Sequence, residues 1–170
     1  MASRKLFPRV CYALAIWAIA AGSSLAQTGG ASSAEDLASR ALAAIESKDK
    51  AALEKLTVTE EEFKLYIWPT THPASMGPQS KPAGAYQALR QASAAGIEQR
   101  IAEYGGRKLK VVRIAFGPER KLKDGRILQA PEITASGEEA GEVKFRIAAS
   151  VLEHGGEFKF VSFFYPPQSK

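Results

Sequence analysis

The sequence predicts an α+β domain in which N-terminal helices pack on a curved four-stranded antiparallel sheet. Two observations indicate this class: apolar residues recur at helical spacing up to Tyr104, and beyond Gly106 the apolar period changes from 3.6 to 2. The composition agrees, because 45% hydrophobic and 24% charged residues in a chain of 170 exclude collagen-like, coiled-coil and wholly disordered proteins and fit one domain.

The first 26 residues predict a secretory signal peptide. A basic start is followed by an apolar run over 10–21 and by small residues up to Ala26. A membrane anchor is the alternative, but the run is shorter than the roughly 20 residues that span a bilayer. We therefore expect an exported protein, periplasmic or extracellular, whose mature chain starts near Gln27. After the signal peptide (1–26), we expect a flexible leader (27–32), one α+β domain (33–166) and a tail (167–170).

Three short helices are predicted next. Ser32 and Glu35 form a capping box ahead of the first helix. Asp49 is placed to cap a second helix, and Thr59 with Glu62 forms another capping box before a third. The residues expected to face inward are Leu37, Ala41, Leu42 and Ile45 in the first helix, Leu53 and Leu56 in the second, and Phe63, Tyr66 and Ile67 in the third.

A proline-rich stretch separates these helices from the longest one. Trp68 precedes Pro69 and is expected to end the third helix, because a residue before proline disfavours the α region. The stretch as far as Pro82 is a long loop, and such loops are often functional. Pro82 suits the first turn of a helix over 83–104, which a glycine pair ends. The inward face of this helix is expected to hold Tyr86, Leu89, Ser93, Ile97, Ile101 and Tyr104.

The C-terminal half of the chain predicts four strands. Gly155 and Gly156 form a two-residue hairpin turn, which places Val151 opposite Phe160 and Ile147 opposite Phe164 on one apolar face. The expected strands are 108–116, 126–136, 142–153 and 157–164.

The opening helix running into residues 45–53 and the final hairpin over 152–163 carry a family resemblance. Over residues 32–165 the chain resembles the nuclear transport factor two-like superfamily, whose curved sheet wraps a long helix to form a cone. The resemblance implies that architecture, and a homodimer through the outer sheet face with Val161 and Phe163 in the contact. One departure is that the proline-rich stretch stands where members place a short strand pair. No motif here matches the acid and base of the superfamily's enzymes.

Cysteine and histidine limit the chemistry that the chain can perform. Cys11 lies inside the predicted signal peptide, so the mature chain is expected to have no disulfide, thiol nucleophile or thiolate metal site. His72 and His154 do not have the spacing of metal ligands, and no glycine-rich phosphate loop precedes a helix. We therefore expect neither a metal nor another cofactor.

The inward aromatic residues allow two interpretations. In a closed core they pack, whereas in a cone with an open mouth they line a pocket for a small apolar ligand. The candidate ligand-binding residues are Trp68, His72, Tyr86 and Tyr104. A non-catalytic ligand-binding or interaction module is the function we expect. The alternative is a small-molecule hydrolase or isomerase, in which Tyr86 would donate a hydrogen bond and His72 would carry a proton.

The net charge of +5 reflects mainly the targeting segment. Removing Arg4, Lys5 and Arg9 from the 23 basic residues leaves 20 against 18 acidic ones, a net charge of +2. Basic residues gather between 107 and 126, which predicts contact with an anionic envelope surface, or alternatively a solvated edge that keeps the domain soluble. No nucleic acid partner is expected, because export removes it. The candidate patch residues are Lys108, Lys110, Arg113, Lys121, Lys123 and Arg126.

Overall fold

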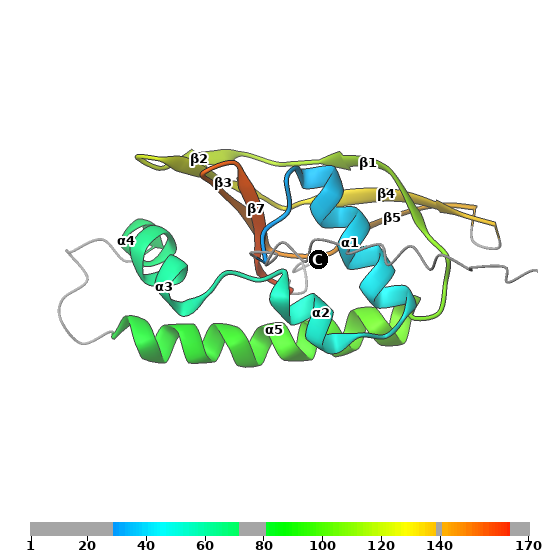
Figure 1. Cartoon of the computed structure of the whole chain (residues 1–170), viewed down its shortest axis with the longest axis horizontal. Helices are drawn as coiled ribbons and strands as arrows, with labels where there is room; N and C mark the ends of the chain where they lie inside the picture. The colour runs from blue at the N-terminus through cyan, green and yellow to red at the C-terminus, as the bar shows by residue number, and fades with distance from the viewer. Residues whose placement is uncertain (1–28, 72–80, 139–140, 164–170) are drawn as a thin grey trace, which may run out of the picture.

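The computed structural model describes residues 29–71, 81–138 and 141–163, and it confirms the α+β class (Figure 1). The signal peptide, Cys11, His72, Phe164 and the tail therefore lie outside the described residues. The helices are α1 (Ala34–Glu46), α2 (Lys50–Lys55), α3 (Glu60–Glu62), the π-helix η1 (Phe63–Ile67), α4 (Trp68–Thr71) and α5 (Pro82–Tyr104). No helix in this part of the chain is both long and apolar enough to span a membrane.

The first helix begins one residue later than predicted. Ser33, rather than Ser32, is the N-cap of α1, and its hydroxyl accepts a hydrogen bond from the Asp36 N–H at 3.0 Å. Ser32 instead donates its own N–H and hydroxyl to the Asp36 carboxylate at 3.0 and 3.2 Å. Asp36 thus accepts the hydrogen bond from the Ser32 N–H that was expected to go to Glu35. The predicted inner face is confirmed, because Leu37, Ala41, Leu42 and Ile45 are buried.

The second and third helices have the predicted caps, but the third does not end at Trp68. Asp49 caps α2, and Thr59 with Glu62 forms the capping box of α3. The chain then stays helical to Thr71, because in η1 the Trp68 N–H bonds to the carbonyl of Phe63. Proline, which has no N–H, is tolerated in the first turn of the α4 segment that follows.

The helix α5 runs along most of the length of the molecule (Figure 1) and matches the prediction within one residue. Ser93 and Ile97 are buried on its inner face, while Tyr86, Leu89, Ile101 and Tyr104 are half-buried. It ends at the glycine pair, where Gly106 has a φ of +83°.

Two antiparallel sheets replace the single four-stranded sheet that was predicted. Among the described residues their strand orders are β1-β4-β5 and β2-β3-β6-β7. The strands are β1 (Lys110–Ala115), β2 (Glu119–Lys121), β3 (Gly125–Gln129), β4 (Glu132–Gly137), β5 (Gly141–Arg146), β6 (Ser150–His154) and β7 (Glu157–Ser162).

The second and third predicted strands each break in the middle. One breaks at Ala130–Pro131, where Ala130 has a φ of +49° and Pro131 has no N–H for the ladder. The other breaks at 147–149, and the Ala130 N–H bonds to the Ala149 carbonyl at 2.9 Å, so the two breaks lie side by side. Periodicity alone could not show this, because apolar residues continue through both breaks.

The final hairpin has the predicted register. Val151 pairs with Phe160, and the φ values of Gly155 and Gly156, +60° and +80°, are those of a type I′ turn. Ile147 lies in the break between β5 and β6, and its predicted partner Phe164 lies outside the described residues.

Two hydrophobic cores result, and the sheet β2-β3-β6-β7 lies between them. Leu128 and Val151 face the first core, while Ile127 and Leu152, next to them along each strand, face the second. The first, which we call the closed core, includes Leu37, Ala38, Ala41, Ile45, Leu53, Ile97, Ile133, Phe145, Val151, Phe160 and Phe163. The second, which we call the open core, comprises Val58, Phe63, Ile67, Ile127, Leu152 and Val161.

Candidate ligand pocket

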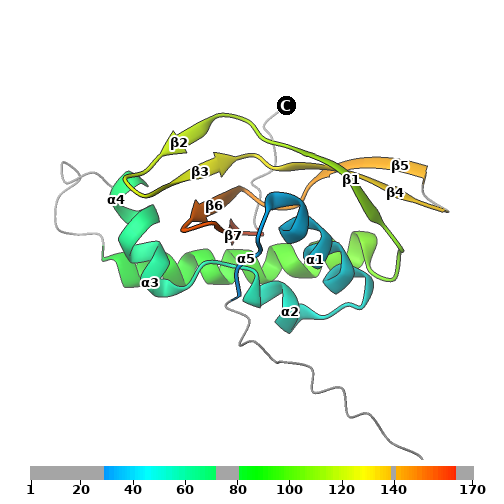
Figure 2. The same ribbon diagram turned by 45° about the horizontal axis from the view of Figure 1, so that its top comes forward.

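A pocket of about 590 Å³ adjoins the open core. Its walls come from η1 and α4, from the N-terminal half of α5, and from the sheet β2-β3-β6-β7, elements that lie at the same end of the molecule (Figure 2). The lining residues are Phe63, Ile67, Thr71, Ala85, Leu89, Arg120, Ile127, Gln129, Ala130, Ala149, Ser150 and Val161.

The helical walls of the pocket are mainly apolar because of residue spacing. Phe63 and Ile67 stand four residues apart in η1, and Ala85 and Leu89 stand four apart in α5, so each pair projects from one face of its helix. Ala85 on α5, and Ala130 and Ala149 at the strand breaks, have only a methyl group as side chain. These small side chains leave volume that larger residues would fill.

The sheet side of the pocket carries most of its polar groups. Gln129 and Ser150 are paired across β3 and β6, which places their side chains next to each other on one face. Within the described residues, neither side chain makes a hydrogen bond. Arg120 is exposed at the edge, and its Nη1 donates to the Thr70 carbonyl at 2.7 Å, which links β2 to α4. No carboxylate is found among the described residues that line the pocket.

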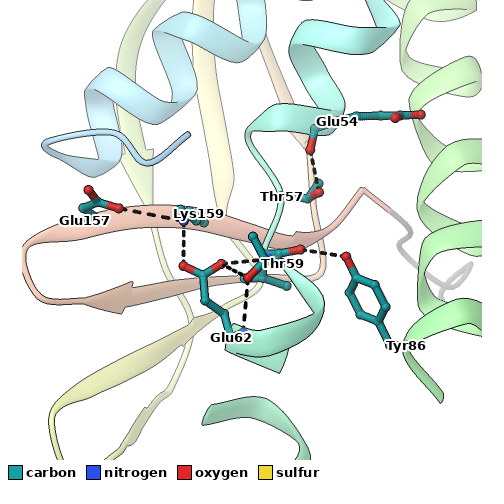
Figure 3. A network of polar contacts seen from close by, with 8 residues as sticks. Glu54, Thr57, Thr59, Glu62, Tyr86, Glu157 and Lys159 are labelled. Carbon is teal, nitrogen blue, oxygen red and sulfur yellow. Dashed lines mark hydrogen bonds and ion pairs between the residues drawn. The ribbon is translucent and has the colours of Figure 1, made fainter. Parts of the chain in front are cut away.

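A half-buried ion pair holds the helical wall against the sheet (Figure 3). Lys159 Nζ on β7 donates to the Glu62 carboxylate at 2.6 Å, and the two side chains are 12% and 24% exposed. The same carboxylate accepts the Thr59 N–H at 2.7 Å. Burial raises the pKa of Glu62, but the hydrogen bonds from Lys159 and Thr59 outweigh it, so the pKa lies below the ordinary value of 4.5.

Trp68 and Tyr86, two of the predicted ligand-binding residues, stand behind the pocket wall. Their rings lie 6.1 and 5.6 Å from that of Phe63, which itself lines the pocket. The Tyr86 hydroxyl donates to the Val58 carbonyl at 3.2 Å (Figure 3), and burial raises the pKa of this phenol. Both residues therefore position Phe63 rather than line the space.

Tyr104 lies away from this group. It is 18 residues beyond Tyr86 on the same helix, about 27 Å along the axis. Its ring stacks on Phe145 in the closed core at 4.4 Å. His72 lies outside the described residues, so the structure brings together only Trp68 and Tyr86 of the four.

The polar residues of the pocket were not predicted as site residues from the sequence. Arg120 was assigned only to the basic stretch, and Gln129 and Ser150 were assigned to no site. A signal was present, because Gln129 follows Ile127 at the strand period of two and so shares its face. No pattern in the sequence predicted the strand breaks that complete this wall.

The predicted anionic-surface residues are all exposed, but they do not form a purely basic patch. Lys108, Lys110 and Arg113 lie on or before β1, and the other three lie in the β2–β3 hairpin. Arg126 pairs with the carboxylates of Glu119, at 3.2 Å, and Glu153.

Two further predicted positions have different surroundings from those expected. Val161 is buried and lines the pocket, and Phe163 is fully buried in the closed core, so neither presents a surface for a dimer contact. The ring of His154, the described histidine, stacks on Tyr66 at 4.1 Å. The homodimer itself stays a prediction.

In comparisons with known proteins, no family model, curated protein or solved structure matches this chain. Across the described ranges, no three histidine, cysteine or acidic side chains gather in a group that could hold a metal ion.

Proposed function

We propose that this protein is a non-catalytic binding protein for a small, mainly apolar molecule, which it holds in the pocket beside the open core. The observation that carries the proposal is the pocket itself. Its volume of about 590 Å³ falls within the range of roughly 300–1,000 Å³ typical of ligand sites. Apolar walls with a few polar groups are also the usual composition of such sites.

The lining residues favour binding over catalysis. Among the described lining residues, Ser150 is the only hydroxyl on the sheet side, and none is a histidine or carboxylate that could activate it as a nucleophile. Tyr86, the hydrogen-bond donor of the enzymatic alternative, donates to a backbone carbonyl. The alternative of a hydrolase or isomerase thus has no acid and base pair among the described lining residues.

We also propose that the protein is exported and belongs with the nuclear transport factor two-like cones. A long helix packed beside antiparallel strands supports the second statement. Sequencing the N-terminus of the protein recovered from its native host tests the first. The expected mature terminus is near Gln27, and an intact Met1 would contradict export.

A fluorescence titration with N-phenyl-1-naphthylamine, an uncharged apolar probe, tests the binding function. We expect saturable binding to the folded protein. The Ala85→Phe variant should weaken it about tenfold by filling the pocket, and Ala88→Phe, on the exposed side of the same helix, should not. Absence of binding, or equal binding by the two variants, would contradict the proposal.

A further inference from the structure

We propose that the pocket selects amphiphiles with an anionic head group, a carboxylate on an apolar chain or ring, and that Arg120 binds the carboxylate. This inference rests on the proposed binding function and adds the chemical class of the ligand.

The charge of the lining residues indicates an anionic ligand. Arg120 is the only charged side chain among the lining residues that the structure describes, and no carboxylate of these residues lies within ion-pair distance of it. Arg126, which lies on the other face of the same hairpin, has two carboxylate partners. The guanidinium that faces the pocket therefore leaves its charge for a ligand, while its neighbour is neutralised within the protein.

The position of the guanidinium suits a head group at the pocket edge. The hydrogen bond from Nη1 to the Thr70 carbonyl fixes the side chain between β2 and α4. A guanidinium carries five N–H donors, so this bond leaves others to meet a carboxylate. Because Arg120 is exposed, a carboxylate there keeps part of its hydration while its apolar chain enters the pocket.

Neutral polar groups extend the same wall. Arg120 pairs with Ile127 across β2 and β3, and Gln129 lies two residues further along β3 beside Ser150. Their amide and hydroxyl groups have no partner within the described chain and can donate to acceptor atoms of a head group. The opposite wall, Ala85 and Leu89 on α5, has no side-chain polar group. Polar groups on the sheet wall, and none on the α5 wall, fit an amphipathic ligand.

The test compares three ligands with one ten-carbon chain: decanoate, 1-decanol and decylamine, each titrated by displacement of N-phenyl-1-naphthylamine. We expect decanoate to bind most tightly and decylamine most weakly. Arg120→Gln should weaken decanoate about tenfold and leave 1-decanol within about twofold, since a hydrogen-bonded charge is lost for one ligand only. Arg126→Gln should change neither.

The outcomes separate this inference from the function on which it rests. If 1-decanol binds as tightly as decanoate, or Arg120→Gln weakens both ligands equally, the anionic class is wrong while apolar binding stands. If the probe itself does not bind the folded wild-type protein, the binding function is wrong. An unchanged urea midpoint for Arg120→Gln would show that this exposed substitution leaves the fold intact.

Discussion

The two hydrophobic cores on either side of the sheet β2-β3-β6-β7 differ in how completely they are filled. In the closed core, Ile133 and Phe160 have no exposed surface, whereas four of the six open-core residues line a pocket of about 590 Å³: Phe63, Ile67, Ile127 and Val161. One sheet thus supports a sealed core on one face and a candidate ligand site on the other.

This difference in filling depends on where the alanines lie in the fold. On α1, Ala38 and Ala41 are fully buried beside Leu37 and Ile45, so larger neighbours fill the space that the alanines leave. Around the pocket, alanines stand on opposite walls: Ala85 lies on α5, and Ala130 and Ala149 lie at the paired strand breaks. Small side chains at these three positions therefore leave the volume of the pocket unfilled.

Truncating one isoleucine in each core should give the largest contrast. Ile133→Ala in the closed core should lower the free energy of unfolding by about 2–5 kcal/mol, because it leaves an enclosed cavity. Ile127→Ala should cost about 1–2 kcal/mol, since it enlarges a pocket that already exists. Urea denaturation measures both. Equal losses would mean that the two cores are packed alike.

Enlarging one alanine beside each core applies the opposite change in volume, and the closed core should again lose more stability. Ala38→Leu should lower the free energy of unfolding by about 1–3 kcal/mol through overpacking. Ala85→Leu should leave it within about 1 kcal/mol, because the new side chain enters the pocket. Thermal and urea unfolding of the two helix variants would check this, and a comparable loss for Ala85→Leu would show that no space is present.

The ion pair on the wall of the open core should give stability that depends on pH. Glu62→Gln should cost about 1–2 kcal/mol at neutral pH by weakening the hydrogen bonds to Lys159 and Thr59. Because the folded-state pKa of Glu62 is lowered, its contribution is present above 4.5 and is lost as the pH falls through that lower value. The difference in the free energy of unfolding between wild type and Glu62→Gln should therefore disappear at acid pH.

The matched control for this ion pair is Glu61→Gln. Glu61 is an exposed carboxylate in the same first helical turn. Urea unfolding from neutral pH to about pH 3 should show a nearly constant, small difference for it. If Glu61→Gln and Glu62→Gln lose stability in parallel, the ion pair contributes nothing beyond the helix dipole.

The smallest expected effect concerns the start of α1, which covers the closed core. Ser33→Ala should cost about 1 kcal/mol by removing the N-cap hydrogen bond to Asp36. Ser39→Ala, on the exposed face of the same helix, should be neutral or slightly stabilising. Thermal unfolding compares the two. A neutral Ser33→Ala would contradict the cap seen in the structure.

The closed core was largely predictable from the sequence, and the pocket was not. Local signals determine the helices: caps, periodic apolar residues and the glycine pair after Tyr104 predicted α1, α2 and α5 within a residue or two. The register of Val151 against Phe160 followed from the turn type and the strand period. These features depend on residues that are close together in the sequence.

The pocket depends on tertiary geometry. Ala130 and Ala149 come side by side only because two strands break together, and Arg120 reaches Thr70 across 50 positions of sequence. The helix also continued past Trp68, because a π-helical turn allowed Pro69 to follow. Aromatic residues were therefore expected to line the site, whereas aliphatic, small and polar residues line it instead.

The most direct test of the account is a two-dimensional ¹⁵N–¹H NMR titration of the folded protein with 1-decanol. We expect saturable shifts of the amide signals of Phe63, Ala85, Ile127 and Val161 around the pocket, and unchanged signals for Leu37, Ala41 and Ile133 in the closed core. Shifts centred on the closed core, or no saturable shift at any amide, would contradict it.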